Sequence, residues 1–153
     1  MSLFTLLKFL HVLLAITAVG ANVTYGVWLS RGARDPRHLP FALRGVKMLD
    51  DRLANPAYAL LLVTGVAMIY AGRLAWTTPW LLVSLFLYGV LVVLGLAGYT
   101  PLLRREIAVL EAEGPDSPAY QRLSGRGTLL GALIAVVVLV ITFLMVTKPV
   151  LWG

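Results

Sequence analysis

The chain has 153 residues, of which 59% are hydrophobic and 13% are charged, and it carries a net charge of +6. Its mean hydropathy is +0.87. Soluble domains average about 45–50% apolar and about 25% charged residues, so this composition excludes an ordinary soluble domain and a disordered chain. Nucleic-acid binding is not expected either, because the basic residues lie in short segments between apolar runs and not on one wettable face.

Four apolar segments are long enough to cross a bilayer, which requires about 20 residues in a helix. They cover residues 3–29, 56–72, 79–103 and 128–147. The first segment lacks the preceding positive charge of a signal peptide, so we interpret it as a retained span. The sequence therefore predicts an all-α polytopic membrane protein, a four-transmembrane-helix bundle that forms a single domain over residues 1–153.

The basic residues are distributed unevenly between the two sides of the predicted bundle. Ten lie in the loops that follow the first and third spans: Arg31, Arg34, Arg37, Arg44, Lys47, Arg52, Arg104, Arg105, Arg122 and Arg126. Lys8, Arg73 and Lys148 lie on the other side. The positive-inside rule then predicts cytoplasmic loops, with both termini outside. We expect a multi-pass protein of the bacterial inner membrane.

Both predicted cytoplasmic loops contain helical patterns. In the first loop one apolar face predicts a short interfacial helix, formed by Ala42, Val46, Leu49 and Leu53. Asn55-Pro56 then predicts the start of the second span. The charged cluster Asp50-Asp51-Arg52 is interpreted as a solvated helix start, with an interhelical salt bridge as the alternative.

In the second loop, the helix of the third span is expected to continue to Glu113. Gly114-Pro115 would stop it, and Ser117-Pro118 would start the next helix. The third and fourth spans therefore predict a cytoplasmic helical hairpin that extends from the bilayer.

The first span contains the residues with the clearest chemical potential. At 100° per residue, one narrow face is small or polar, and it is made of Lys8, His11, Ala15, Ala18, Asn22 and Tyr25. The opposite face is apolar and suited to lipid: Val12, Leu13, Ile16 and Val23. An ionisable residue within a span marks a candidate functional site, so His11 is expected to point into the bundle.

Three interpretations of His11 remain open. It could be an axial ligand to the iron of haem b. It could carry a proton at a quinone-like or porphyrin-like substrate. It could also be a structural histidine that donates a hydrogen bond to a tyrosine, a threonine or a carbonyl on a neighbouring helix.

Under the haem interpretation, the cations Lys8, Arg73 and Lys148 would pair with propionates, since no acidic side chain lies on their side of the membrane. Snorkelling toward lipid phosphates explains the same cations without haem. Asn22 lies deeper on the His11 face and completes the candidate cofactor-binding set.

Three short stretches carry a family resemblance. The stretches are Lys8 to Leu13 with Gly20, Leu53 to Tyr58 with Thr64-Gly65, and Met145 to Pro149. They resemble a family of small four-span bacterial membrane proteins described as predicted integral membrane proteins of unknown function. The same stretches are distantly similar to HemJ-type protoporphyrinogen oxidase and to CopD-type copper-resistance proteins. This resemblance implies that His11 matches their first-helix histidine, Lys8 the preceding lysine and Lys148 the terminal lysine.

Two non-haem functions compete with this hypothesis, and the sequence does not decide whether the chain is an enzyme. One is an accessory or self-associating subunit of a membrane complex, which small residues such as Gly127, Gly131 and Ala135 favour, since they allow close helix contact. The other is a transporter or channel, ranked last because no charged pair is evident at mid-membrane.

Overall fold

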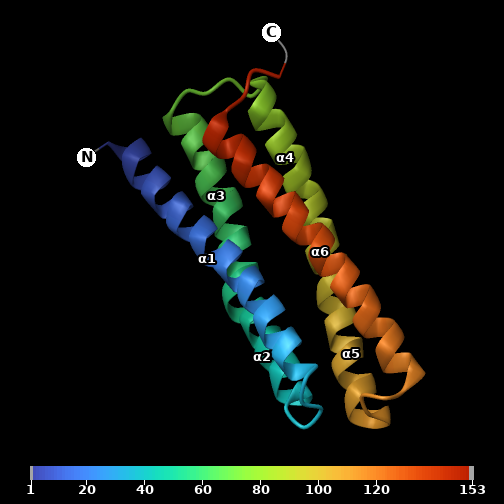
Figure 1. The fold of residues 1–153 in the computed structure, drawn as a ribbon. Coiled ribbons are helices and arrows are strands. Elements are labelled where there is room, and N and C mark those ends of the chain that lie inside the picture. Colours follow the sequence, from blue (N-terminus) through green and yellow to red (C-terminus); the bar gives the residue numbers. More distant parts are fainter. Residues whose placement is uncertain (1, 152–153) are drawn as a thin grey trace.

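The computed structural model describes residues 2–151, and within them the chain is helical without strands (Figure 1). The elements are α1 (Leu3–Gly32), α2 (Leu39–Leu49), η1 (Asp50–Ala54), α3 (Asn55–Ala71), α4 (Pro79–Val92), η2 (Val93–Tyr99), α5 (Thr100–Glu113) and α6 (Pro118–Thr147), where η marks a π-helical turn. Four continuous helices in this range are long and apolar enough to cross a membrane. The predicted all-α four-span fold is confirmed.

The helix ends follow the signals in the sequence. Ser2 and Ser117 cap α1 and α6, because their hydroxyl oxygens accept hydrogen bonds from the N–H groups of Thr5 and Tyr120, both at 3.2 Å. Gly114, which follows α5, has a φ of 82° that favours glycine. The predicted helical hairpin of the third and fourth spans is therefore present, with its turn between Glu113 and Pro118.

The second span does not start at Asn55, as the sequence suggested, because α2, η1 and α3 form one helix over Leu39–Ala71. Proline has no N–H, and its ring collides with the carbonyl four residues before it. The chain accommodates Pro56 by widening the preceding turn, in which the Asn55 N–H donates to the carbonyl of Asp50, five residues back. The same solution recurs before Pro101, where the Thr100 N–H donates to the carbonyl of Gly95.

The π turn explains a further departure from the predicted helix face. Ala42 and Val46 are buried, as their spacing predicts, but Leu53 is 41% exposed. A π turn contains one residue more than an α-helical turn, so it rotates the residues that follow it. The face predicted from a regular helix therefore ends at η1.

The helices are longer than a bilayer is thick. A helix of 30 to 35 residues measures about 45–52 Å at about 1.5 Å per residue, whereas the hydrocarbon core measures about 30 Å. Figure 1 shows the α1–α2 and α5–α6 turns at one end of the bundle, called the turn end below. Both termini and the α3–α4 loop lie at the other, called the terminal end.

The bundle is built from two helix pairs. In the first, α1 packs along α2 and α3, and in the second, α6 packs along α4 and α5. The pairs meet where α2 faces α5, and there the Arg44 guanidinium donates to Glu111 at 2.6 and 2.9 Å. Apolar side chains on the outer faces are exposed, Ile16, Phe86 and Val146 among them. This distribution suits lipid contact.

The end of α1 packs tightly against α2 at Gly32, which is buried. A Cβ atom at this position would lie 2.8 Å from the Cβ of Ala42. We therefore expect Gly32→Ala to lower the free energy of unfolding by about 1–3 kcal/mol through overpacking. Unfolding of the detergent-solubilised protein by SDS measures this change.

Gly26→Ala is the matched control in the same helix, because a Cβ atom at Gly26 would meet no atom within 4 Å. It should be neutral or stabilise the protein by about 0.5–1 kcal/mol. Equal effects of the two substitutions would contradict the packing role of Gly32.

Candidate functional site

The polar face of α1 points toward the bundle, as its periodicity predicts. Ala18 and Tyr25 are buried, His11 and Asn22 are partly buried, and Lys8 near the helix end is exposed. The opposite residues Val12, Leu13, Ile16 and Val23 are 48–65% exposed. The first span thus presents its small and polar residues to α3 and its apolar residues to the surroundings.

His11 forms a hydrogen bond between α1 and α3. Its Nδ1 lies 2.9 Å from the Thr64 hydroxyl, whose own proton goes to the carbonyl of Leu60 at 2.8 Å. The hydroxyl must therefore accept the Nδ1 proton, which leaves Nε2 with a lone pair. The imidazole also packs against Gly65, where a Cβ would lie 3.2 Å from Cε1. This geometry matches the interpretation of His11 as a hydrogen-bonded packing residue.

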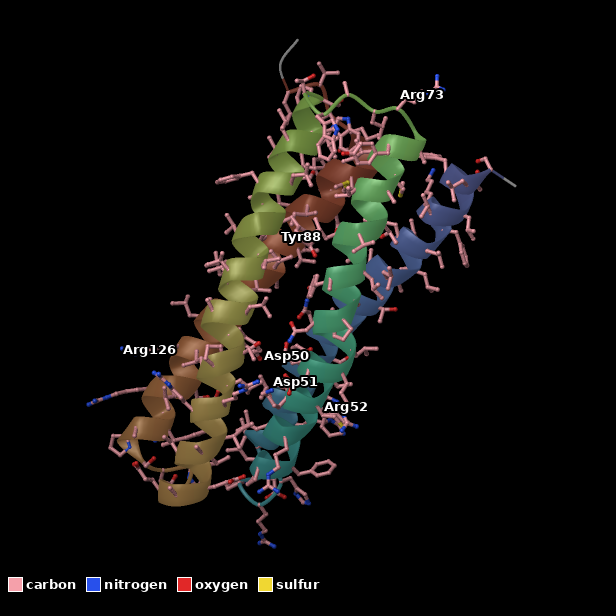
Figure 2. The ribbon with its side chains drawn as sticks, turned by 180° about the vertical axis from the view of Figure 1, so that it is seen from behind. Asp50, Asp51, Arg52, Arg73, Tyr88 and Arg126 are labelled. Carbon is pink, nitrogen blue, oxygen red and sulfur yellow. The ribbon has the colours of Figure 1, made fainter. Side chains whose placement is uncertain are left out.

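The cations of the candidate set are not brought together around His11. Lys148, in left-handed backbone after α6, places its Nζ 5.5 Å from the centre of the Trp80 ring. Arg73 projects outward from the loop after α3 (Figure 2). Lys8, Arg73 and Lys148 form no ion pair within residues 2–151. The three cations therefore lie on separate elements near the terminal end.

The structure gives no positive support for haem at His11. Two pockets of about 270 and 300 Å³ lie near η2 and near the α1–α2 turn, and His11 lines neither. Within residues 2–151, no group of three or more His, Asp or Glu side chains could hold a metal. Haem b at His11 stays a prediction without support from the structure.

The structure instead gathers polar groups around Asp50, in the interior between the two helix pairs (Figure 2). Asp50 is 6% exposed, which overturns its interpretation as part of a solvated helix start, whereas Asp51 and Arg52 are exposed as expected. Its Oδ2 accepts hydrogen bonds from Thr100 Oγ1 at 3.0 Å and from Asn55 Nδ2 at 3.3 Å. Asp50 forms no salt bridge within residues 2–151, and the nearby Lys47 pairs with Asp51.

A second group of polar side chains lies next to Asp50, on the side of the terminal end. The Asn22 amide donates to the Tyr58 hydroxyl, and the Tyr88 hydroxyl donates to the backbone carbonyl of Tyr58. Tyr25 stacks on Tyr99 with ring centres 6.4 Å apart and planes within 2°. The Tyr25 hydroxyl is buried and has no hydrogen-bond partner within the described residues. Buried hydroxyls usually have a partner, so this group is chemically unusual.

On the side of the turn end, Glu106 is a further buried acid, 6% exposed. Its Oε2 would lie 3.2 Å from a Cβ at Gly127, so the glycine of α6 makes room for the carboxyl. Glu106 follows Thr100 by six residues, or about 9 Å along the helix. Glu106, Asp50 and the tyrosines therefore succeed one another along the bundle.

A signal for both buried acids was present in the sequence. Asp50 follows Val46 by four residues, and Glu106 lies three after Leu103 and four before Leu110. Each acid therefore continues an apolar helix face that turns out to be buried. Tyr58, Tyr88 and Tyr99 line the helix contacts next to Asp50.

The small residues of α6 are used inside the chain. Gly131 lies against the ring of Tyr99, and Gly127 lies against Glu106 and Leu102. The predicted close helix contact is present between α6 and the helix that contains η2 and α5. Ala135, the third member of the stripe, is exposed.

Comparisons with known proteins gave one family match. Residues 5–149 match a family described as predicted integral membrane protein (DUF2269). No curated protein and no solved structure matches the chain. The similarity to HemJ-type and CopD-type proteins is not shown by these comparisons.

The His11–Thr64 bond can be tested through stability. Thr64→Val keeps the shape of the side chain but removes the acceptor of the Nδ1 proton, and we expect a loss of about 0.5–2 kcal/mol. Thr17→Val is the control, because the Thr17 hydroxyl bonds to Leu13 of its own helix.

The measurement is a double-mutant cycle with His11→Leu in SDS unfolding. A coupling energy near zero between His11 and Thr64 would contradict an interhelical bond.

Proposed function

The chain belongs to the predicted integral membrane protein family DUF2269, and from this premise we propose that it carries protons within the membrane through Asp50. The supporting observation is the burial of this carboxyl group between the helix pairs, with Thr100 and Asn55 as donors and no cationic partner within residues 2–151. Ionisable side chains inside membrane bundles are costly, and they commonly belong to proton or ion pathways.

The polar groups along the bundle suggest the order of transfer. A proton enters from water at the turn end, passes Glu106 and binds the Asp50 carboxylate at Oδ1, which accepts no hydrogen bond within residues 2–151. Phenol hydroxyls both donate and accept. Tyr25 and Tyr58 can therefore each take a proton on one side while releasing their own on the other, so no redox partner is required.

The two π turns support the same location. Such turns are rare, and they frequently occur at functional sites. Here η1 begins with Asp50, and η2 ends next to Thr100, its hydrogen-bond donor.

The orientation is part of the proposal. Ten basic residues lie between Arg31 and Arg52 or between Arg104 and Arg126, the segments that contain the two turns of the turn end, and three lie outside these segments. By the positive-inside rule, we therefore propose that the turn end faces the cytoplasm and both termini lie outside the bacterial inner membrane. The proposed proton pathway would then open first to the cytoplasm.

The alternative of an accessory or self-associating subunit has less support. Gly127 and Gly131, which motivated it, already contact η2 and α5 within the chain. Lipid contact is consistent with the exposed apolar faces.

The proposal is tested by Asp50→Asn, which keeps an oxygen acceptor for Thr100 but replaces the second carboxyl oxygen, where the proton would bind, with an NH2 group. Proton entry is measured in proteoliposomes with a pH-sensitive dye inside and a potassium diffusion potential as driving force. We expect the rate to fall by about a hundredfold, the lower range for a positioned proton-transfer group.

Asp51→Asn is the matched control, since it removes a neighbouring carboxylate that is exposed and paired with Lys47. It should leave the proton flux unchanged. If wild-type vesicles take up no more protons than empty ones, or if both variants behave alike, the proposal is wrong.

Tyr25→Phe separates a working hydroxyl from a structural one. Because the buried Tyr25 hydroxyl has no partner within residues 2–151, its removal should not lower the free energy of unfolding and should raise it by up to about 1–3 kcal/mol. It should still slow proton entry, by roughly tenfold.

Tyr58→Phe is the comparison, because it leaves the Asn22 amide without its acceptor and should cost about 1–3 kcal/mol. Both quantities are measured on the same preparations, by SDS unfolding and by the dye assay. A Tyr25→Phe protein that unfolds early but conducts normally would contradict the proposed role of Tyr25.

A further inference from the structure

A second polar and aromatic site lies at the turn end, where α1 passes into α2. It is a pocket of about 300 Å³ lined by Trp28, Arg31, Gly32, Asp35, His38, Phe41 and Ala42. The rings of Trp28 and Phe41 meet edge to face with centres 5.9 Å apart. They are 38% and 67% exposed. Gly32 packs closely against Ala42 and forms the floor of the pocket between α1 and α2.

The charges around this pocket favour an anion. Arg31 lines it, Arg34 and Arg37 follow in the same turn, and none of the three forms an ion pair within residues 2–151. The single acid, Asp35, has its own partners, since its oxygens lie 2.8 Å from His38 Nδ1 and 3.1 Å from the Arg37 N–H. The hydrogen bond with His38 also lowers the pKa of the Asp35 carboxyl. Three arginines against one carboxylate leave the turn positively charged.

The position in the bundle indicates where the anion comes from. Trp28 lies near the end of α1 and Phe41 in the first turn of α2, at the helix ends where aromatic rings meet the bilayer interface. Arginines just beyond a span face the phosphate layer. An apolar ring pair next to a free guanidinium matches the upper acyl chain and the phosphate of one lipid.

We propose that this pocket binds the headgroup of an anionic phospholipid, with its phosphate on Arg31 and its first acyl carbons against Trp28 and Phe41. The site is separate from Asp50 and does not depend on the proposed proton transfer. Guanidinium and phosphate groups pair through two parallel hydrogen bonds, which gives the site selectivity for a phosphate that is not masked by a cationic headgroup.

The test is native mass spectrometry of the full chain in detergent, titrated with phosphatidylglycerol or with phosphatidylcholine. We expect one phosphatidylglycerol to be retained in preference to phosphatidylcholine. Arg31→Gln should weaken its retention about tenfold, as for loss of one charge-assisted hydrogen bond. Arg34→Gln makes the same charge change outside the pocket lining and should change retention by no more than about twofold, because exposed charges are screened.

A second pair of variants tests the apolar part of the site. Phe41→Ala should weaken lipid retention, whereas Phe86→Ala, at a residue exposed elsewhere, should not. Inorganic phosphate alone should fail to displace the lipid at millimolar concentration. Equal losses in the two arginine variants would show a general basic surface and overturn the proposal. Displacement by inorganic phosphate, with no effect of Phe41→Ala, would identify a phosphate site and overturn the lipid assignment.

Discussion

The hydrogen bond that Thr100 donates to Asp50 joins the two helix pairs where their inner helices widen into π turns. On the side of the turn end, the Arg44–Glu111 pair connects the same two helices, and on the other side the Tyr88 hydroxyl reaches the carbonyl of Tyr58. These contacts follow one antiparallel register between the second and third long helices. Because the prolines at 56 and 101 create the widened turns, they place the carboxyl and hydroxyl groups that hold this register.

Burying an acidic side chain at a contact between two helices costs free energy. Apolar residues of similar volume often stabilise a protein as well as a buried polar pair, or better, whereas removing one partner of a pair is costly. Asp50 and Glu106 both lie in buried helix faces that otherwise contain Val46, Leu103 and Leu110. Stability alone would favour apolar residues at both positions, so their presence is better explained by chemistry that an apolar side chain cannot perform.

The parts of the structure that depend on local pattern were predictable from the sequence. The four spans followed from apolar length, and the inward face of α1, including His11 and Asn22, followed from its period. The joint around Asp50 was not predicted, since a π turn leaves no periodic signal and Pro56 resembled a helix start. Haem at His11 stays a prediction, and its expected cations Lys8, Arg73 and Lys148 lie on three different elements. Their shared side of the membrane carried no information about distance.

In each widened turn, the number of residues determines which face of the following helix is buried. Closing the turn over Val93–Tyr99 to an α-helical one, with all of its residues kept, would rotate α5 by about 100° relative to α4. Leu103, Glu106 and Leu110 would then leave the buried face together, although none of them had been substituted. A relative of this protein that aligns across η2 with a single-residue gap would therefore keep the same buried faces with an ordinary α-helical turn.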